Sequence, residues 1–268
     1  MIQEGVWKEK QTIKSFQMGP NFQMNISTIS ELLQEAGGNH SNFNEFGIKE
    51  MIATGRIWVL SRLKVEAEKL PVWGDEVTVE TWVKSAEGVT SLRDFIIRNT
   101  AGEVILRGSS LWYAVDIKKR RPTSLEDMAK KVTIRSDLSA IDRDSLEKLP
   151  LPKHVDYVDE VKVKYSDLDP ALHANNVKYL SWALNSYPIA FHKAHQFKGF
   201  EINFLAETLY GQSLEVETEE KQVASDVYMT TVIKHKDTGK PGCLIRTTWQ
   251  QVAEYERQAE EATAEALL

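Results

Sequence analysis

The chain has 268 residues, of which 33 are Lys or Arg and 39 are Asp or Glu, so its formal net charge is −6. This acidic balance argues against a general nucleic-acid binder, because such proteins usually carry a basic domain. Hydrophobic residues make up 42% of the chain and charged residues 27%, which is ordinary for a globular protein with a buried core.

The sequence also bears on compartment and on metal chemistry. Its single cysteine, Cys243, excludes an internal disulfide and a cysteine-based zinc site. The first residues lack the apolar segment of a secretory signal, and the uncharged stretch at residues 179–191 is shorter than the ~20 residues that a membrane span needs. We therefore expect a soluble, cytoplasmic protein that contacts no membrane. No metal-ligand or phosphate-binding motif is present, so we expect neither a metal nor a cofactor.

In chain order, the first predicted elements are a helix and a set of strands. Apolar residues between Ile26 and Ala36 recur at helical spacing and predict a helix that ends at Gly37-Gly38. The period changes to two at residues 77–83, which predicts antiparallel strands.

A second helix and a second set of strands follow a polar connector. Val177, Leu180 and Leu184 predict the helix, which ends before Pro188, and the alternation resumes at residues 214–218. The boundaries that we predict are residues 1–117 for the first unit, 118–155 for the connector, 156–251 for the second unit and 252–268 for a C-terminal helical tail.

The two units look like copies of one another. Residues 67–81 match residues 206–218, at an offset of 139 before the turn and 137 after it, and residues 25–33 match residues 176–184 more weakly at an offset of 151. A long helix with one apolar face needs a curved sheet around it, and two such sheets can join edge to edge, which removes exposed strand edges. We predict an α+β fold with two long helices, each wrapped by an antiparallel sheet, and the sheets joined edge to edge.

The residues best suited to chemistry precede the second helix. Asp169 and His173 lie four residues apart, and Asn175 or Asn176 is a natural N-cap. The helix start at Asn176-Val177 offers free backbone N–H groups, which suit an oxygen that gains negative charge. A structural interpretation stays open, in which the acid forms the turn and the asparagine only caps the helix.

Glu207 is a third candidate, either as a base or as a residue that orients the imidazole. At the offsets above, the first copy has Met18 and Phe22 in place of the acid and the imidazole, and Glu68 in place of Glu207. Because Glu68 has no chemical neighbours in the sequence, Glu207 could also be structural. The simplest hypothesis is that the second copy performs chemistry and the first lines an apolar pocket.

Several stretches together resemble one protein family, the acyl-ACP thioesterases of plants and their bacterial relatives. The resemblance covers about residues 5–251. The stretches that carry it are Leu33–Ala36 with Asn39-His40, Leu70–Asp75, Thr81–Val83, Leu92–Phe95, Ser109–Trp112, Lys119–Pro122 and Asp167–Leu180.

The resemblance implies a tandem hotdog fold and hydrolysis of the thioester between a fatty acyl chain and acyl carrier protein. The catalytic Asp, His and Glu of the family fall on Asp169, His173 and Glu207. Two positions depart from the family pattern: its Asn falls on Ala171, and the plant family's Cys falls on Thr208. A covalent cysteine mechanism is therefore not expected here, and Asn175 or Asn176 would have to replace the missing amide.

The same function implies two binding surfaces. We expect the first unit to select acyl chain length, with a pocket lined by Met51, Ile52, Trp58 and Leu60. Acyl carrier proteins are generally acidic, so we expect a basic docking surface at Lys118, Lys119, Arg120 and Arg121. A solvated connector is the structural alternative for these four residues.

Two other functions stay open. The chain could hydrolyse acyl-CoA, or it could bind acyl thioesters without hydrolysis, which Ala171 favours. The tandem copies already mimic a dimer, so both a monomer and a homodimer are consistent with the sequence.

Overall fold

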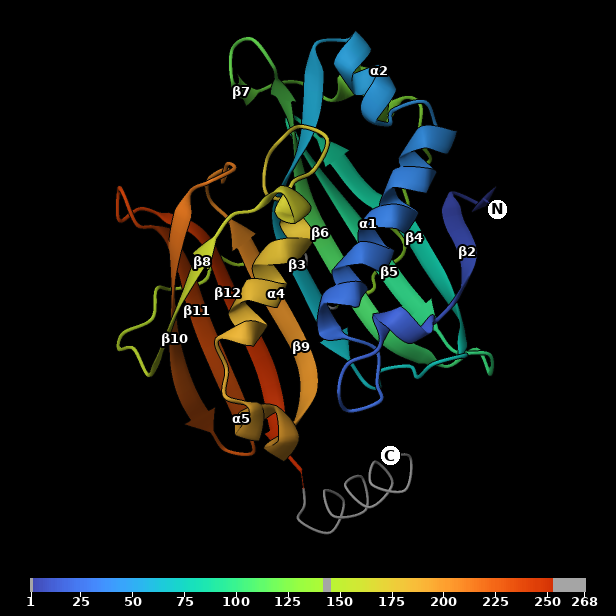
Figure 1. The fold of residues 1–268 in the computed structure, drawn as a ribbon. Coiled ribbons are helices and arrows are strands. Elements are labelled where there is room, and N and C mark those ends of the chain that lie inside the picture. The colour runs from blue at the N-terminus through green and yellow to red at the C-terminus, as the bar shows by residue number, and fades with distance from the viewer. Residues whose placement is uncertain (1, 142–145, 253–268) are drawn as a thin grey trace. The chain divides into compact units, whose positions relative to one another are not determined.

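The computed structural model describes residues 2–141 and 146–252 (Figure 1). The described residues divide into two compact units, one formed by residues 2–18, 23–141 and 146–148 and the other by residues 19–22 and 149–252. Apart from Val252, the helical tail that we predict at residues 252–268 lies outside the described residues. None of the helices in the described ranges is long and apolar enough to cross a bilayer.

The first unit is an antiparallel sheet that packs against a long helix (Figure 1). Its sheet has the order β1-β2-β4-β5-β6-β3, and β7 pairs with β6. The elements are β1 (Ile2–Gln3), β2 (Val6–Thr12), α1 (Ile26–Phe43), α2 (Ile48–Ala53), β3 (Arg56–Ala67), β4 (Glu76–Glu87), β5 (Thr90–Arg98), β6 (Val104–Asp116), β7 (Arg121–Pro122) and α3 (Glu126–Ala129), with a short 3-10 turn at Ser15–Gln17.

The helix α1 is longer than the sequence predicts. It begins after the N-cap Asn25 and buries Ile29 and Leu33 against the sheet, but it continues through Gly37 to Phe43. The predicted end at Gly37-Gly38 is wrong because residues beyond it, His40 and Ser41, are also buried and extend the packed face of the helix.

The second unit repeats this arrangement. Its sheet has the order β8-β10-β11-β12-β9, which matches β2-β4-β5-β6-β3 strand for strand. The elements are β8 (Tyr157–Lys162), α4 (Asn176–Asn185), α5 (Ile189–Ala194), β9 (His195–Phe204), β10 (Ser213–Val223), β11 (Asp226–His235) and β12 (Pro241–Gln251), with a 3-10 turn at Tyr165–Asp167. The predicted second helix and the alternation at Leu214 and Val216, both fully buried, are confirmed.

Parts of the expected connector, residues 118–155, pack onto the sheets. In the first unit, the backbone N–H of Ala140 donates to Oδ2 of the buried Asp94 at 2.9 Å. In the second unit, Leu149 packs against Val232 in a small apolar cluster. These segments therefore cover the outer faces of the sheets, opposite the helices.

Candidate active site

The loop that leads into α4 is held by the side chain of Asp169. Its Oδ1 accepts the backbone N–H of Ala171 at 2.8 Å and that of His173 at 3.1 Å. The backbone of Asp169 also pairs with His173, through an N–H to C=O bond of 2.8 Å. Of the two roles that the sequence leaves open for this carboxylate, these bonds support orientation of the loop.

The second segment of the site approaches this loop from the end of β9. His173 forms an antiparallel bridge with Leu209, and the N–H of Ala174 donates to the C=O of Thr208 at 2.8 Å. This pairing brings Nε2 of His173 to 3.9 Å from Oε2 of Glu207. The two side chains are 29% and 41% exposed, so solvent and substrate can reach both.

The start of α4 has one backbone donor without a protein acceptor. Asn175 is the N-cap, and its Oδ1 accepts the N–H of Val177 at 3.3 Å. The N–H groups of Ala174 and Lys178 donate to backbone carbonyls, and that of Asn175 donates to Asp167. Among residues 174–178, only the N–H of Asn176 donates to no group of the described chain. Of the three predicted positioning residues, Asn176 therefore has the donor that is available for a ligand.

Backbone pairing also fixes which residues of the two units are equivalent. The N–H of Met24 donates to the C=O of Pro71 at 2.8 Å, as the N–H of Ala174 does to the C=O of Thr208. Met24 therefore corresponds to Ala174, an offset of 150 where the sequence match predicts 151. Pro71 corresponds to Thr208, an offset of 137 where the sequence match predicts 139. The sequence match at residues 67–70 is coincidental, because the hydrogen bonds rather than residue identities define the register.

With this register, the first copy in the sequence has Gly19, Gln23 and Leu70 at the places of the acid, the imidazole and the second carboxylate. Leu70 is buried. The first copy therefore lacks all three groups. The counterparts that the sequence predicts are wrong: Met18, Phe22 and Glu68.

Tyr179 is a neighbour of the site that sequence reasoning missed. It lies one turn into α4, is nearly buried, and packs its ring against Phe204 at the end of β9. Burial raises the pKa of Tyr179 to about 12, and the negative charges of Glu207 and Asp169 act in the same direction. The signal in the sequence was its helical spacing from Asn176, which places it on the turn below the helix start.

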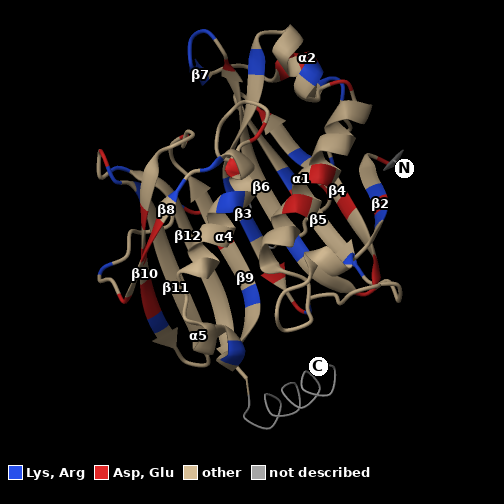
Figure 2. Cartoon of the chain, in the orientation of Figure 1, with Lys and Arg blue, Asp and Glu red and all other residues tan. Residues whose placement is uncertain are grey.

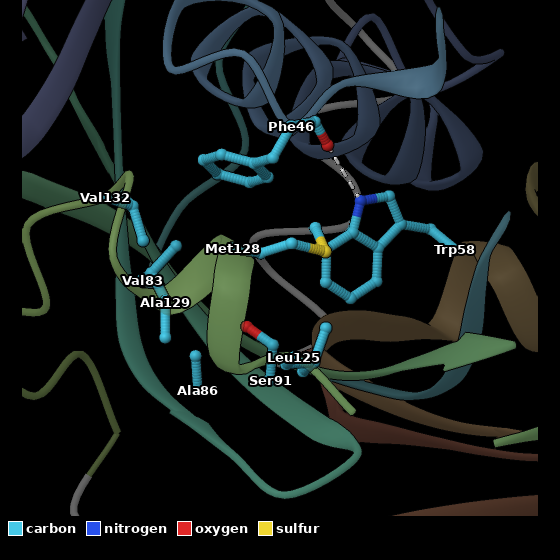
Figure 3. A pocket seen from close by; sticks show the side chains of 9 residues that line it. All are labelled: Phe46, Trp58, Val83, Ala86, Ser91, Leu125, Met128, Ala129 and Val132. Carbon is cyan, nitrogen blue, oxygen red and sulfur yellow. Dashed lines mark hydrogen bonds between the residues drawn. The ribbon is translucent and has the colours of Figure 1, made fainter. Parts of the chain in front are cut away.

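The predicted acyl-chain residues lie in the first unit, at the end near α2 and α3. A small cavity of about 10 Å³ lies there, roughly the space of one water molecule. Figure 3 shows Trp58 with Phe46 and Met128 among the residues that line it. The indole N–H of Trp58 donates to the C=O of Phe46 at 3.1 Å, which fixes the ring. Met51 is buried in the same apolar cluster.

Of the four predicted pocket residues, only Trp58 lines this space, and Met51 is buried in the apolar cluster next to it. Ile52 is 55% exposed on α2, and Leu60 is buried on β3, outside the pocket lining. The residues that the sequence missed come from other elements of the unit: Phe46, Val83, Ala86, Ser91, Leu125, Met128, Ala129 and Val132.

The predicted docking residues lie on the turn between β6 and β7 and on the first residue of β7, where Lys and Arg (blue) gather in Figure 2. All four are exposed: Lys118, Lys119, Arg120 and Arg121. Oδ1 of Asp116 accepts the backbone N–H groups of Lys118 and Lys119 at 2.9 and 2.8 Å, and this lowers the pKa of that carboxyl group. The turn is therefore built by an aspartate, and the basic side chains project from it.

Comparison with known proteins identifies the family. The sequence matches two profiles, described as the acyl-ACP thioesterase N-terminal domain over residues 4–132 and the acyl-ACP thioesterase C-terminal domain over residues 152–251. It is 32% identical over 221 residues to the chloroplastic palmitoyl-acyl carrier protein thioesterase of Arabidopsis thaliana, which covers 77% of this chain and 53% of that protein. The chain thus spans about half the length of this curated relative.

Two solved structures are also similar. The acyl-ACP thioesterase from Bacteroides thetaiotaomicron has a TM-score of 0.82 at 20% identity, with 93% of this chain and 100% of that chain covered, and shows the fold. The 12:0-ACP thioesterase from Umbellularia californica has a TM-score of 0.78 at 25% identity, with 92% and 94% covered. With these likenesses and both profiles, the chain has a tandem hotdog fold and belongs to the acyl-ACP thioesterase family.

Proposed function

We propose that this chain hydrolyses the thioester between a fatty acyl chain and acyl carrier protein, releasing the free fatty acid. Membership of the family supports the substrate class. The observation that carries the proposal is the 3.9 Å approach of His173 Nε2 to Glu207 Oε2 beside a helix start with an open N–H group.

In this proposal, His173 and Glu207 activate one water molecule. Two acceptors 3.9 Å apart can both lie at a hydrogen-bond distance of about 2.8 Å from the same water oxygen. The neutral imidazole or the carboxylate removes a proton as the water oxygen attacks the thioester carbonyl. Asp169 acts on this step indirectly, because its carboxylate holds the backbone of His173.

The carbonyl oxygen gains negative charge during this attack and needs a donor. The N–H of Asn176 is suitable, because it is oriented by the helix and lies at the positive end of the helix dipole. A preorganised donor of this kind contributes roughly 10²- to 10³-fold in rate. Ala171 has no side-chain amide that could donate to the carbonyl oxygen, so we assign the role of oxyanion donor to the backbone N–H of Asn176.

Departure of the thiol needs little assistance from the protein. A thiol has a pKa of about 8.5, so the thiolate leaves readily without a strong general acid. Activation of water and stabilisation of the oxyanion are therefore the two tasks of the site. The acyl chain would enter the first unit beside Trp58, where side chains must move to admit it because the cavity has only about 10 Å³. The acidic carrier would meet the basic turn at Lys118–Arg121.

A thiol-release assay tests this function. The purified chain is given acyl-ACP and acyl-CoA of equal acyl length, and free thiol is measured with a thiol reagent. We expect release from both, faster from acyl-ACP, and less than a tenth of that rate in His173→Ala and Glu207→Gln. Binding without thiol release would reject hydrolysis, and a higher kcat/KM for acyl-CoA would reject the carrier protein as the preferred substrate.

A further inference from the structure

Two exposed leucines lie next to His173, one before it in the chain and one opposite it in the strand pairing. Leu172 precedes His173 in the chain and is 67% exposed, and Leu209 is paired with His173 and is 46% exposed. Isolated exposed leucines are common and need no explanation. These two are different, because each lies directly beside a residue with a proposed chemical role.

The backbone gives no reason for a leucine at position 172. Its φ is +63°, in the left-handed region where Gly and Asn are favoured and a leucine is strained. Its exposure shows that core packing does not favour leucine either. Phe22, the equivalent residue of the first copy, is likewise exposed with a φ of +58°. The place of Leu172 directly before His173 is therefore what makes it a candidate for a ligand contact.

The position of Leu209 follows from the strand pairing. The bond from Ala174 N–H to Thr208 C=O flanks the pair of His173 and Leu209, so this is a non-hydrogen-bonded pair, in which side chains on one face are closest. The Cβ atoms in such pairs are ~4.5–5.5 Å apart. Leu209 therefore stands beside the imidazole.

Glu207 lies on the same side as Leu209. Thr208 between them is completely buried, whereas Glu207 and Leu209 are both exposed, as expected for side chains that alternate along an extended segment. An apolar side chain therefore borders both members of the proposed pair that activates water.

The substrate atoms nearest to this site are those that flank the thioester carbonyl. On one side they are the first methylenes of the acyl chain, and on the other they belong to an arm that contains amides. Leucine side chains offer no hydrogen bond, so they favour burial of methylenes and penalise burial of amides.

We propose that Leu172 and Leu209 form an apolar subsite for the first methylenes of the acyl chain, next to the carbonyl under attack. This rests on the proposed function, because it needs an acyl thioester bound at His173 and Glu207. The subsite would hold the chain so that the carbonyl faces the activated water.

The test compares kinetics for Leu172→Asn, Leu209→Ala and a matched control, Ala224→Asn. Ala224 is exposed and has a φ of +54° in the β10–β11 turn, so asparagine relieves similar backbone strain there without approaching the site. KM and kcat are measured with acyl-ACP and with the acyl thioester of N-acetylcysteamine, a small thiol, at several acyl lengths.

We expect Leu172→Asn and Leu209→Ala to raise KM about three- to tenfold for both carriers, by the same factor at each acyl length, since all acyl chains share the first methylenes. Leu209→Met, which keeps an apolar side chain, should restore most of the affinity. Ala224→Asn should leave KM and kcat unchanged, and the melting temperatures of both asparagine variants should stay at or above that of the wild type.

Three outcomes would overturn the subsite. A rise in KM only with acyl-ACP would assign the leucines to the carrier protein or its arm. A fold-rise in KM that grows with acyl length would place the leucine contact further along the acyl chain. KM values equal to that of Ala224→Asn would show that the leucines do not contact the acyl chain. A wild type that releases no thiol from either substrate would instead refute the proposed function, and the subsite with it.

Discussion

Oδ1 of Asn175 accepts the backbone N–H of Val177 and so leaves the N–H of Asn176, between the two, as the uncapped donor at the start of α4. Asn176 is the first helical residue, and Asn175 before it has φ −61° and ψ 136°. Proline is tolerated at the first helical position and prefers an extended residue before it. The proposed oxyanion donor can therefore be deleted without breaking the helix.

Asn176→Pro should lower kcat by roughly 10²- to 10³-fold and leave the helix and the melting temperature nearly unchanged. The reason is that proline removes the N–H group but keeps helical φ. Asn176→Ala is the matched control, because it keeps the N–H and removes only the side chain. Steady-state kinetics and circular dichroism of both variants are the measurements. If Asn176→Ala lost as much activity as Asn176→Pro, the donor would be the side-chain amide instead.

Helices and strands of this chain were largely predictable because their apolar residues repeat at simple periods. The stripe through Ile29 and Leu33 and the alternation at Leu214 and Val216 all face a core, so pattern and burial agree. The end of α1 was not predictable in this way. Gly37 lies inside the helix because His40 and Ser41 beyond it are buried against Arg93 of β5, a contact between segments more than fifty residues apart.

The candidate site, like the fold, was predictable from the sequence only in part. The two segments that carry His173 and Glu207 were identified from residue types and from the resemblance to a family, and the structure brings their side chains to 3.9 Å. The division of tasks at the helix start was not predictable, because either Asn175 or Asn176 could cap it. The choice depends on one hydrogen bond, from Val177 N–H to Asn175 Oδ1. That the sheets join edge to edge stays a prediction.

The pocket in the first unit makes a prediction about acyl chain length. Met128→Ala should enlarge the space beside Trp58 and shift the preferred product to longer fatty acids. Each buried CH₂ contributes about 0.8 kcal/mol, so two further carbons are worth roughly fifteenfold in selectivity. Ile52→Ala is the control, because Ile52 is exposed outside the pocket. Product profiles by gas chromatography decide the matter, and an unchanged profile in Met128→Ala would locate the acyl chain elsewhere.

The basic turn makes a prediction about the carrier. Reversing Lys118 and Lys119 to Glu should raise KM for acyl-ACP at least severalfold, with little effect on a small acyl thioester, because only the carrier is a large acidic partner. The effect should shrink at high salt, since exposed charges are screened. Lys221→Glu, on an exposed position of β10, is the control for a general change in charge. Equal changes for both substrates would exclude docking at this turn.

A buried basic pair in the first unit makes a prediction about stability and pH. His40 on α1 is fully buried, and its Nδ1 lies 2.8 Å from a guanidinium nitrogen of Arg93, which is also buried. Because the guanidinium can only donate, the imidazole accepts through Nδ1 and is neutral. Burial, and then the positive charge of Arg93, lower the pKa of His40 from 6.5 to about 3.

The sign of the effect follows from proton binding. Between pH 6.5 and about 3 the unfolded chain protonates His40 and the folded chain does not, so acid favours unfolding. The stability due to neutral His40 is complete above pH 6.5 and is lost as the pH falls toward 3, by at most about 5 kcal/mol. Urea unfolding at a series of pH values should therefore show a smaller acid loss in His40→Asn than in the wild type. If His40→Asn kept the wild-type slope instead, the buried imidazole would already be charged in the folded state.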